Sequence, residues 1–323
     1  MRFANITIDM DAVEPNGDKD CVVSSNDSDA VPVSVIITTY NRPRYLEDTL
    51  RSVMDQDYAN LEVIVVDDGT EGDDNRCVCS KWPQVRYYKI KNTGSPIVPR
   101  NWGFKQSQGV YVAFLDDDDL WLPNKIKLQV EILNRHPDFG LVHGCCRVID
   151  SDGQETGEIA GRLKMPENKH GEVFDRMVGN FTVMMPTPLI RRCLIEKIGG
   201  FNDTIPAAGE DMEFFCHLAY YTKFYYVDEP LALYRVHGGN ISSNNHHYNH
   251  LPLILYRLVK RLREKGLERR RFLMIRQRLI QRQLDVVMDT KTLGLALINC
   301  FKMTPFFWGS PQVMKSIVKK VFA

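Results

Sequence analysis

Four consecutive aspartates, in the stretch VYVAFLDDDDLWLP at residues 110–123, are the side chains of this sequence that most directly suggest chemistry. An apolar run precedes them and a tryptophan and a proline follow, so buried neighbours are expected to hold the backbone on both sides. Carboxylates that lose contact with water have raised pKa values unless a cation neutralises them. Mg²⁺ and Mn²⁺ prefer oxygen ligands, commonly one or two carboxylates together with phosphate oxygens of a substrate. The run therefore favours a site for a divalent metal ion and a diphosphate over a solvated turn, which is the usual meaning of adjacent charges.

No cation lies near the four acids in sequence. Their spacing also predicts different positions for neighbouring carboxylates. Side chains two residues apart in a strand point to the same side. We therefore expect Asp116 and Asp118 to share one region, whereas Asp117 points elsewhere.

The segments that must position this run alternate between strands and helices. VPVSVIITTYNRP is β-branched and apolar, and it predicts a buried strand at 33–39. A helix follows, with apolar side chains at helical spacing, namely Leu46, Leu50, Val53 and Met54. The same order then recurs, with strands in LEVIVVDDGT and at 85–90, a helix near 97–108, and a strand at 110–115. Such alternation implies right-handed crossovers and a largely parallel sheet covered on both faces.

Two of the predicted strands end in acid. One runs into Asp67 and Asp68, and the other runs into the aspartates at 116–119. In open sheets of this kind, ligands bind outside the carboxyl ends of the strands. We therefore expect both acidic groups on the same edge of the sheet.

The chain from about residue 139 predicts an α+β segment that completes the sheet and covers the site. FGLVHGCCRVID indicates a strand, TPLIRRCLIEKIGGF a strand leading into a helix, and EDMEFFCHLAYY an amphipathic helix. Gly199 and Gly200 are expected to end the first of these helices. KFYYVDEPLALYRVHGG predicts two short strands around Pro230.

The two ends of the chain differ from its middle, 31–245, in charge and pattern. Residues 1–30 are rich in acid and lack apolar periodicity, which predicts a flexible extension. Residues 246–323 predict basic amphipathic helices, and residues 257–282 carry eleven Lys or Arg against two Glu. Interleaved apolar and aromatic residues favour the surface of an anionic membrane. Packing against the protein or a dimer contact is the alternative, and a nucleic-acid surface is the least favoured.

Composition and cysteine spacing exclude several other classes. Lys plus Arg and Asp plus Glu both number 41, so net charge indicates no partner. The sequence has neither the pattern of a secretory signal nor an apolar run near the ~18–20 residues of a spanning helix. Among eight cysteines, Cys77 and Cys79 form a lone Cys-x-Cys pair without the second pair of a zinc site. We expect a cytoplasmic protein with reduced thiols that contacts the inner face of the cell membrane peripherally, if at all.

Several motifs in fixed order resemble the family 2 inverting glycosyltransferases of GT-A fold. They are VSVIITTYNRPRYLEDTLRSVMDQDYANLEVIVVDDGT, PRNWGFKQSQGVYVAFLDDDDLWLP, GGF with GEDMEFFCHLAY, and YRVH. The resemblance covers roughly residues 31–240. It implies an α/β, Rossmann-like fold with a mixed, mostly parallel sheet flanked by helices, here with a C-terminal helical appendage. It specifies the fold and reaction class but leaves the sugar open.

The resemblance also implies roles for residues that would bind the donor. Thr38 and Tyr40 would contact the nucleotide base, with the Tyr40 ring available for stacking. Asp68 would accept a hydrogen bond from the imino group of the base, and Asp117 would lie near the ribose. Arg100 would approach the diphosphate or the acidic run. The plain alternative is that Thr38 and Tyr40 cap the strand and that Arg100 forms a surface ion pair.

The same resemblance implies metal ligands in the acidic run. Asp118 would bind Mn²⁺ or Mg²⁺, and Asp116 would support it. Because acid occupies all four positions at 116–119, this assignment is open by one residue. His237, in YRVH, matches a position that in some relatives reaches the metal or the diphosphate. A structural role is the alternative for this histidine.

Asp211, in GEDMEFF, matches the catalytic base of the family. A carboxylate can act as the base when proton transfer lags behind bond cleavage at the sugar. Alternatively, Glu210 and Asp211 only complement the dipole of the helix that they begin.

The expected activity is the transfer of a sugar from a nucleoside diphosphate sugar, UDP-linked by preference, to a glycan or lipid-linked acceptor in surface polysaccharide synthesis. One rival is a nucleotidyltransferase, which would favour a glycine-rich phosphate loop where this chain has TTYNRP. A second rival is a nucleotide-sugar-binding protein of the same fold without turnover. The sequence leaves the acceptor, the linkage and a homo-oligomeric state open.

Overall fold

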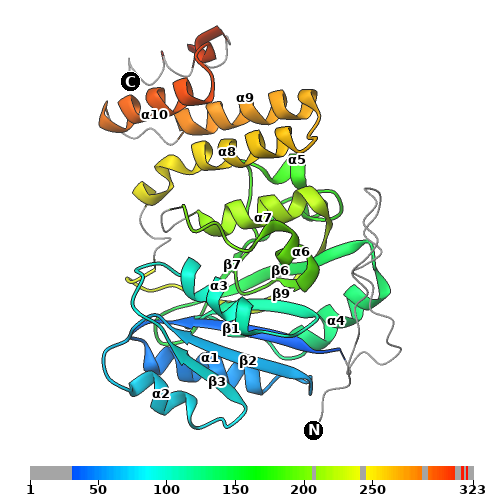
Figure 1. The fold of residues 1–323 in the computed structure, drawn as a ribbon, viewed down its shortest axis with the longest axis vertical. Helices are drawn as coiled ribbons and strands as arrows, with labels where there is room; N and C mark the ends of the chain where they lie inside the picture. Colours follow the sequence, from blue (N-terminus) through cyan, green and yellow to red (C-terminus); the bar gives the residue numbers. More distant parts are fainter. Residues whose placement is uncertain are drawn as a thin grey trace.

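The computed structural model describes most of the chain, and Figure 1 shows its fold. The described residues are 31–205, 209–240, 245–285, 290–309, 314–315 and 318. The extension predicted at residues 1–30 lies outside them.

A mixed sheet forms the centre of the molecule. Its strands are β1 Val33–Thr39, β2 Leu61–Asp67, β3 Val85–Lys89, β4 Tyr111–Asp116, β5 Leu120–Trp121, β6 Phe139–Ile149, β7 Glu155–Ala160, β8 Leu189–Arg191 and β9 Lys223–Arg235. The first half runs in the order β3-β2-β1-β4, and all its strands are parallel. The second half continues through β8, β6 and β9 to β5, with β7 paired to β6. Here β8 is antiparallel to both of its neighbours, whereas β6 and β9 are parallel.

Helices cover both faces of this sheet. The helices of the described residues are α1 Pro43–Met54, α2 Asp74–Cys79, α3 Ile97–Gln106, α4 Lys125–Arg135, α5 Phe174–Met177, α6 Arg192–Ile198, α7 Glu210–Tyr221, α8 Leu251–Glu264, α9 Arg269–Asp285 and α10 Thr290–Met303. Short 3-10 turns occur at η3 Pro166–Lys169, η5 Asn245–His250 and η6 Phe307–Gly309. The strands predicted at 33–39, 85–90 and 110–115 and the helix near 97–108 are confirmed to within two residues at each end.

Side chains that alternate along β1 give the sheet two apolar faces. All seven residues of β1 are buried. Val35 and Ile37 belong to the hydrophobic cluster that contains the apolar side chains of α1, α2 and α4. Ile36 belongs to the opposite cluster, which includes residues of α3, α6 and α7. A strand buried on both faces has to be apolar throughout, which explains its sequence.

The segment around Pro230 forms one strand, so the prediction of two short strands is wrong. β9 is continuous and pairs with β6 over its length. The register shifts, however, between the pair His143 and Tyr226 and the pair Cys145 and Pro230. A bulge of this kind accommodates proline, which has no N–H to donate to the ladder.

The C-terminal helices α8, α9 and α10 lie together at the end of the molecule away from α1 and α2 (Figure 1). Their apolar side chains share one hydrophobic cluster with α7 and with one face of the sheet. Arginines of this region also contact the rest of the protein, because Arg261 pairs with Glu213 and Arg271 with Asp175. The apolar face of α8 is therefore packed against protein, as in the packing alternative, and is not open to a membrane. Within the described part of the chain, no helix is both long and apolar enough to cross a bilayer.

The described cysteines are not all reduced. Cys193 is disulfide-bonded, so the expectation of reduced thiols is wrong for this residue. The free thiols are Cys77, Cys79, Cys145, Cys146, Cys216 and Cys300.

Candidate active site

A cavity of about 590 Å³ opens at the carboxyl ends of β1 and β4. These strands are neighbours, and Thr38 lies opposite Asp116 in their register. The strand order β3-β2-β1-β4 places the switch point of the parallel half between them, where open α/β sheets bind ligands. Most of the residues that the sequence suggested line this one cavity, namely Thr38, Tyr40, Asp68, Arg100, Asp116, Asp117, Asp118 and Asp211.

Basic side chains from other elements contact the acidic run. Arg42 Nη1 lies 2.6 Å from Asp118 Oδ2 and 3.3 Å from Asp117 Oδ1. His237 Nε2 lies 3.0 Å from the same oxygen of Asp118. Because Arg42 contacts both Asp117 and Asp118, and Asp117 lines the same cavity as Asp116 and Asp118, the prediction that Asp117 points elsewhere is wrong. β4 ends at Asp116 and the chain turns there, so the alternation of a strand does not extend to the next residues.

Arg100 joins the end of β4 to the start of α7. Its Nη2 donates to Asp116 Oδ1 at 2.7 Å, and its Nη1 donates to Glu210 Oε1 at 3.1 Å. The residue is only 4% exposed, and its guanidinium lies 5.4 Å from the centre of the Phe201 ring. Arg100 thus approaches the acidic run, one of the two places that the sequence left open. The Arg100 side chain and its pair with Glu210 are buried, unlike the ion pair of the surface alternative.

The backbone of the acidic run is fixed by side chains from α1 and β9. Thr49 Oγ1 lies 2.8 Å from the carbonyl oxygens of both Asp117 and Asp119. The N–H of Arg235 donates to Asp119 Oδ1, and its Nε donates to the carbonyl oxygen of Asp118, both at 2.9 Å. Burial, together with the charge of Asp118, raises the pKa of Asp117 and of Asp119. Buried and bonded on several sides, these carboxylates are held in place before any ligand arrives.

The acidic pair at the end of β2 divides into two environments. Asp67 is fully buried, and its Oδ2 accepts a hydrogen bond from the hydroxyl of Tyr87 at 2.8 Å. Asp68 lines the cavity, and its Oδ1 accepts a hydrogen bond from the N–H of Thr93 at 3.0 Å. Burial raises the pKa of Asp68. Of the two, Asp68 is therefore the residue that can contact a ligand in the cavity.

Tyr40 and Thr38 lie where β1 enters the same cavity. Tyr40 is 47% exposed, so a face of its ring is accessible to a ligand. Thr38 Oγ1 donates to Asp116 Oδ1 at 3.2 Å. This bond links the first strand directly to the acidic run.

Asp211 is the second residue of α7 and lines the cavity beside Glu210. Gly209 caps the helix with a φ of 102°, and a Cβ at this position would lie 2.9 Å from Leu251 of α8. Burial, and then the charge of Glu210, raise the pKa of Asp211 to about 6, while Arg100 opposes this shift. Near neutral pH the carboxylate is thus mainly ionised but ready to accept a proton.

The site fits a metal ion only if the substrate completes its coordination. Among the residues that the structure describes, no group of three His, Cys, Asp or Glu side chains is placed to hold an ion. Asp118 and His237 offer an oxygen and a nitrogen 3.0 Å apart. Mg²⁺ and Mn²⁺ often take one or two protein ligands plus phosphate oxygens and water, and this pair suits that pattern.

Arg42 and Tyr248 are among the side chains that line the cavity but were not predicted from the sequence. Arg42 follows the end of β1 by three residues, and a basic residue in the loop after a predicted strand was a signal available in the sequence. Tyr248 belongs to η5, between the sheet and the C-terminal helices, and no sequence pattern points to it. Burial raises the pKa of Tyr248 to about 12, and the charges of Asp211 and Glu210 add to the shift.

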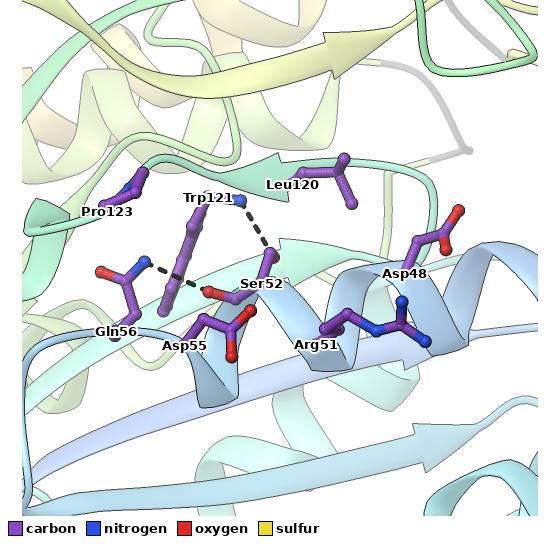
Figure 2. A pocket seen from close by; sticks show the side chains of 8 residues that line it. All are labelled: Asp48, Arg51, Ser52, Asp55, Gln56, Leu120, Trp121 and Pro123. Carbon is purple, nitrogen blue, oxygen red and sulfur yellow. Dashed lines mark hydrogen bonds between the residues drawn. The ribbon is translucent and has the colours of Figure 1, made fainter.

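A second, smaller hollow of about 280 Å³ lies between α1 and β5 (Figure 2). Here the N–H of Trp121 donates to Ser52 Oγ at 3.1 Å. Gln56 Nε2 donates to the carbonyl oxygens of Ser52 and Leu122, at 3.2 and 2.9 Å. These bonds fasten β5, which directly follows the acidic run, to α1. We therefore assign the hollow to the support of the run.

Comparison with known sequences identifies the family. The profile described as Glycosyl transferase family 2 matches residues 34–196, half of the chain. The chain belongs to this family. An uncharacterized glycosyltransferase of Rickettsia bellii is 32% identical over 216 residues, which are 66% of this family 2 chain and 30% of the relative. TuaG of Bacillus subtilis, which its name assigns to teichuronic acid biosynthesis, is 30% identical over 239 residues, covering 71% of this chain and 89% of TuaG.

Solved structures show the same fold. TarS 1–349 of S. aureus has a TM-score of 0.63 and 20% identity, covering 85% of this chain and 81% of that one. Its complex with UDP-GlcNAc has a TM-score of 0.57 and 19% identity, covering 84% and 89%. The mannosyltransferase PcManGT from Pyrobaculum calidifontis, in complex with GDP-Man and Mn²⁺, has a TM-score of 0.53 and 15% identity, covering 90% and 87%. These similarities confirm the predicted GT-A sheet flanked by helices.

Proposed function

We propose that this family 2 chain is an inverting glycosyltransferase that moves a sugar from a nucleoside diphosphate sugar to a hydroxyl group of an acceptor. The observation that carries the proposal is one cavity lined by Asp68, by the acidic run and by Asp211. Asp68 can pair with the base of the donor, the acidic run can hold a cation that neutralises the diphosphate, and Asp211 can accept the proton of the acceptor hydroxyl. Membership of the family supports the reaction class.

In the proposed reaction, Asp211 accepts the proton of the acceptor hydroxyl while the acceptor oxygen bonds to the anomeric carbon. The bond between that carbon and the diphosphate breaks, and its electron pair leaves on the diphosphate oxygen. Attack from the face opposite the diphosphate inverts the configuration. The pKa of about 6 suits Asp211 to this task, because it is deprotonated near neutral pH yet remains basic enough to take up a proton.

The nucleotide would lie against β1 and the end of β2. We assign base contacts to Thr38, Tyr40 and Asp68, and the ribose to Asp117. Arg100 is assigned to hold Asp116 and Glu210 in place, since both of its terminal nitrogens are bonded to these carboxylates.

A divalent cation would be held by Asp118 and His237, with Asp116 in support. When bound, Mn²⁺ or Mg²⁺ supplies Lewis-acid stabilisation of the charge on the leaving diphosphate. The donor set of one carboxylate and one imidazole, beside an acidic run, supports this assignment. PcManGT, which shares the fold, was solved with Mn²⁺.

The donor we favour is a UDP-sugar, because TarS, of the same fold, was solved with UDP-GlcNAc. PcManGT was solved with GDP-Man, which makes GDP-sugars the alternative. For the acceptor we favour a glycan or a lipid-linked sugar of surface polysaccharide synthesis. The name of TuaG, which assigns that relative to teichuronic acid biosynthesis, supports this choice.

A panel of UDP-, dTDP- and GDP-sugars tests the function. The purified chain is incubated with each donor and Mn²⁺ or EDTA, and release of the nucleoside diphosphate is measured with and without candidate acceptors. We expect release from one donor class that requires the metal and increases with an acceptor, and NMR of the product should show the inverted anomer. Binding without release would favour the rival binding protein, and release of pyrophosphate would favour a nucleotidyltransferase.

We also propose that α10 and Phe306, just before η6, contact an anionic membrane surface. Ile298, Phe301 and Phe306 are 55%, 54% and 78% exposed, beside the exposed Lys302. The sequence from Thr290 to the end of the chain contains five lysines and no acid. Exposed aromatic residues among lysines suit the interface of anionic lipids.

Sedimentation with vesicles of phosphatidylglycerol and phosphatidylcholine tests this contact. We expect binding that weakens at high salt and falls severalfold when Phe301 and Phe306 are both changed to Ser. Met165→Ser, at a position 56% exposed outside the C-terminal helices, is the matched control. Equal sedimentation of the double variant and the control would contradict the proposal.

A further inference from the structure

Arg42 occupies the place in the acidic run where the proposed function requires a cation. Its Nη1 lies 2.6 Å from Asp118 Oδ2 and 3.3 Å from Asp117 Oδ1. Its Nη2 donates to the carbonyl oxygen of Gly239 at 3.2 Å. The oxygen of Asp118 that accepts from Arg42 is also the one nearest His237. A divalent ion bound by Asp118 Oδ2 and His237 would therefore compete with the guanidinium for that oxygen.

We propose that Arg42 is the exchangeable counter-ion of the acidic run. It neutralises Asp117 and Asp118 in the ligand-free protein, leaves Asp118 when the divalent ion binds, and then pairs with the diphosphate of the donor. This inference rests on the proposed function, because it requires a donor diphosphate and its cation.

The other arginines of the site are less suited to such an exchange. Arg100 and Arg235 are 4% and 2% exposed, and each bonds to more than one element of the fold. Moving either would leave buried carboxylates or carbonyls without partners, which is costly. The side chain of Arg42 is 31% exposed and lines the cavity, so it can turn toward a ligand while remaining solvated.

The backbone around Arg42 is fixed, so the exchange would involve the side chain. Asn41 has a φ of 53°, and its N–H donates to Thr70 Oγ1 at 2.8 Å. The N–H of Tyr40 donates to Asp117 Oδ2 at 3.3 Å. α1 begins at Pro43, whose ring also restricts the chain. A long side chain on a rigid turn can alternate between two anionic partners within the same cavity.

Guanidinium binds both carboxylate and phosphate by charge-assisted, often bidentate hydrogen bonds, so one side chain suits both states. The exchange has opposite consequences for the two ligands. In wild type, Arg42 competes with the ion when the ion arrives alone, but it adds a contact when the nucleotide is present. Loss of Arg42 should therefore strengthen binding of the metal alone and weaken binding of the nucleotide with metal. A purely structural residue would weaken both.

Titration calorimetry of the full chain with Mn²⁺ alone, and with UDP in saturating Mn²⁺, tests the inference. For Arg42→Gln we expect about fivefold or more tighter binding of Mn²⁺ alone and about tenfold weaker binding of UDP, in the range of typical coupling between sites. Arg42→Lys keeps the positive charge but cannot form the bidentate hydrogen bonds of a guanidinium. Its affinities for Mn²⁺ and UDP should therefore lie between those of wild type and Arg42→Gln. It also serves as the test variant if Arg42→Gln does not fold, as judged by circular dichroism. Arg51→Gln, on the exposed side of α1 with its side chain 64% exposed, is the matched control and should match wild type.

The outcomes separate the inference from the proposed function. Wild type that binds no Mn²⁺ even with UDP present would overturn the metal assignment, and the exchange with it. Wild type that binds both ligands, with a variant whose affinity for Mn²⁺ alone is unchanged or weaker, would overturn only the exchange.

Discussion

Asp211 and Asp118 are carboxylates of one cavity, but their neighbours suit them to different tasks. Asp118 is bonded to Arg42, whose charge a bound cation can replace, and it lies beside His237, a second candidate ligand of that cation. Asp211 lies beside Glu210, and burial together with that negative neighbour raises its pKa to about 6. Environments that separate the properties of two acids are a common basis for assigning different roles to them. Asp211 is therefore the carboxylate suited to proton transfer.

Replacing Asp211 with Asn removes the proton acceptor but keeps the size of the side chain. We expect Asp211→Asn to fold and to bind UDP within about twofold of wild type, while sugar transfer falls by about 10² to 10⁴-fold, the usual contribution of a positioned base. Steady-state kinetics and calorimetry provide the two readouts. Asp203→Asn, at an exposed position in the loop before α7, is the control. Transfer by Asp211→Asn at more than a tenth of the wild-type rate would remove Asp211 from the role.

The pH dependence of transfer follows from the raised pKa of Asp211. The base must be ionised, and a carboxyl with a pKa of about 6 is protonated below that pH. kcat/KM should therefore rise about tenfold per pH unit up to about pH 6 and level off above it, because this ratio reports the groups of the free enzyme. A profile measured from pH 4.5 to 8 checks this. A flat profile through pH 6 would show that another group accepts the proton.

Among the described helices, α1 is the one that holds the acidic run in position. It covers one face of the sheet through Leu46, Leu50 and Val53, and its polar side chains bond to the chain after β4. Thr49 contacts the run itself, and Ser52 accepts from Trp121 of β5. Gln56, just after the helix, donates to the carbonyl oxygen of Leu122. The helix thus links core packing to the position of the carboxylates.

Changing Thr49 to Val removes the hydroxyl between the carbonyl oxygens of Asp117 and Asp119 with little change in shape. We expect the free energy of unfolding to fall by about 1–3 kcal/mol, because buried acceptors lose their donor. The affinity for UDP should fall as well, because the hydroxyl of Thr49 no longer holds the backbone of the acidic run in position. Denaturant unfolding and calorimetry measure the two effects. Ser80→Ala removes a similar but exposed hydroxyl bond to a carbonyl, at 2.7 Å from Cys77, and should change neither.

At the scale of the whole molecule, the C-terminal helices share their hydrophobic core with the sheet and α7. Leu258 of α8 is fully buried in the same cluster as Phe214 of α7 and Phe114 of β4. Tyr248, in the turn before α8, lines the cavity with Asp211. Folding of these helices and formation of the site are therefore expected to be coupled.

Leu258→Ala tests this coupling. We expect it to reduce the free energy of unfolding by about 2–5 kcal/mol, as in other buried leucine truncations, within a single transition. Tryptophan fluorescence and circular dichroism should report the same midpoint. Leu273→Ala, at a position 38% exposed on α9, should change the free energy of unfolding by less than about 0.5 kcal/mol. Separate transitions for the two probes would show that the helices unfold independently.

The sequence by itself determined the order of strands and helices in the first half and the common edge of the two acidic groups. β-branched apolar runs and helical periodicity are local patterns, and parallel strands necessarily bring their carboxyl ends together. The family resemblance singled out Asp68 from its acidic pair and added Asp211, and both line the same cavity in the structure.

Only the tertiary structure decided which cations meet the acidic run and where its side chains point. Arg42 precedes α1, Arg100 lies on α3 and Arg235 ends β9, so the sequence could suggest such cations but could not decide which of them meet Asp116–Asp119. Asp117 follows the last residue of β4, and the direction of a side chain after a strand depends on the turn and its partners. The apolar face of α8 likewise indicated only that something must cover it. The three-dimensional fold determines that α7 and the sheet do so, because burial depends on which surfaces meet.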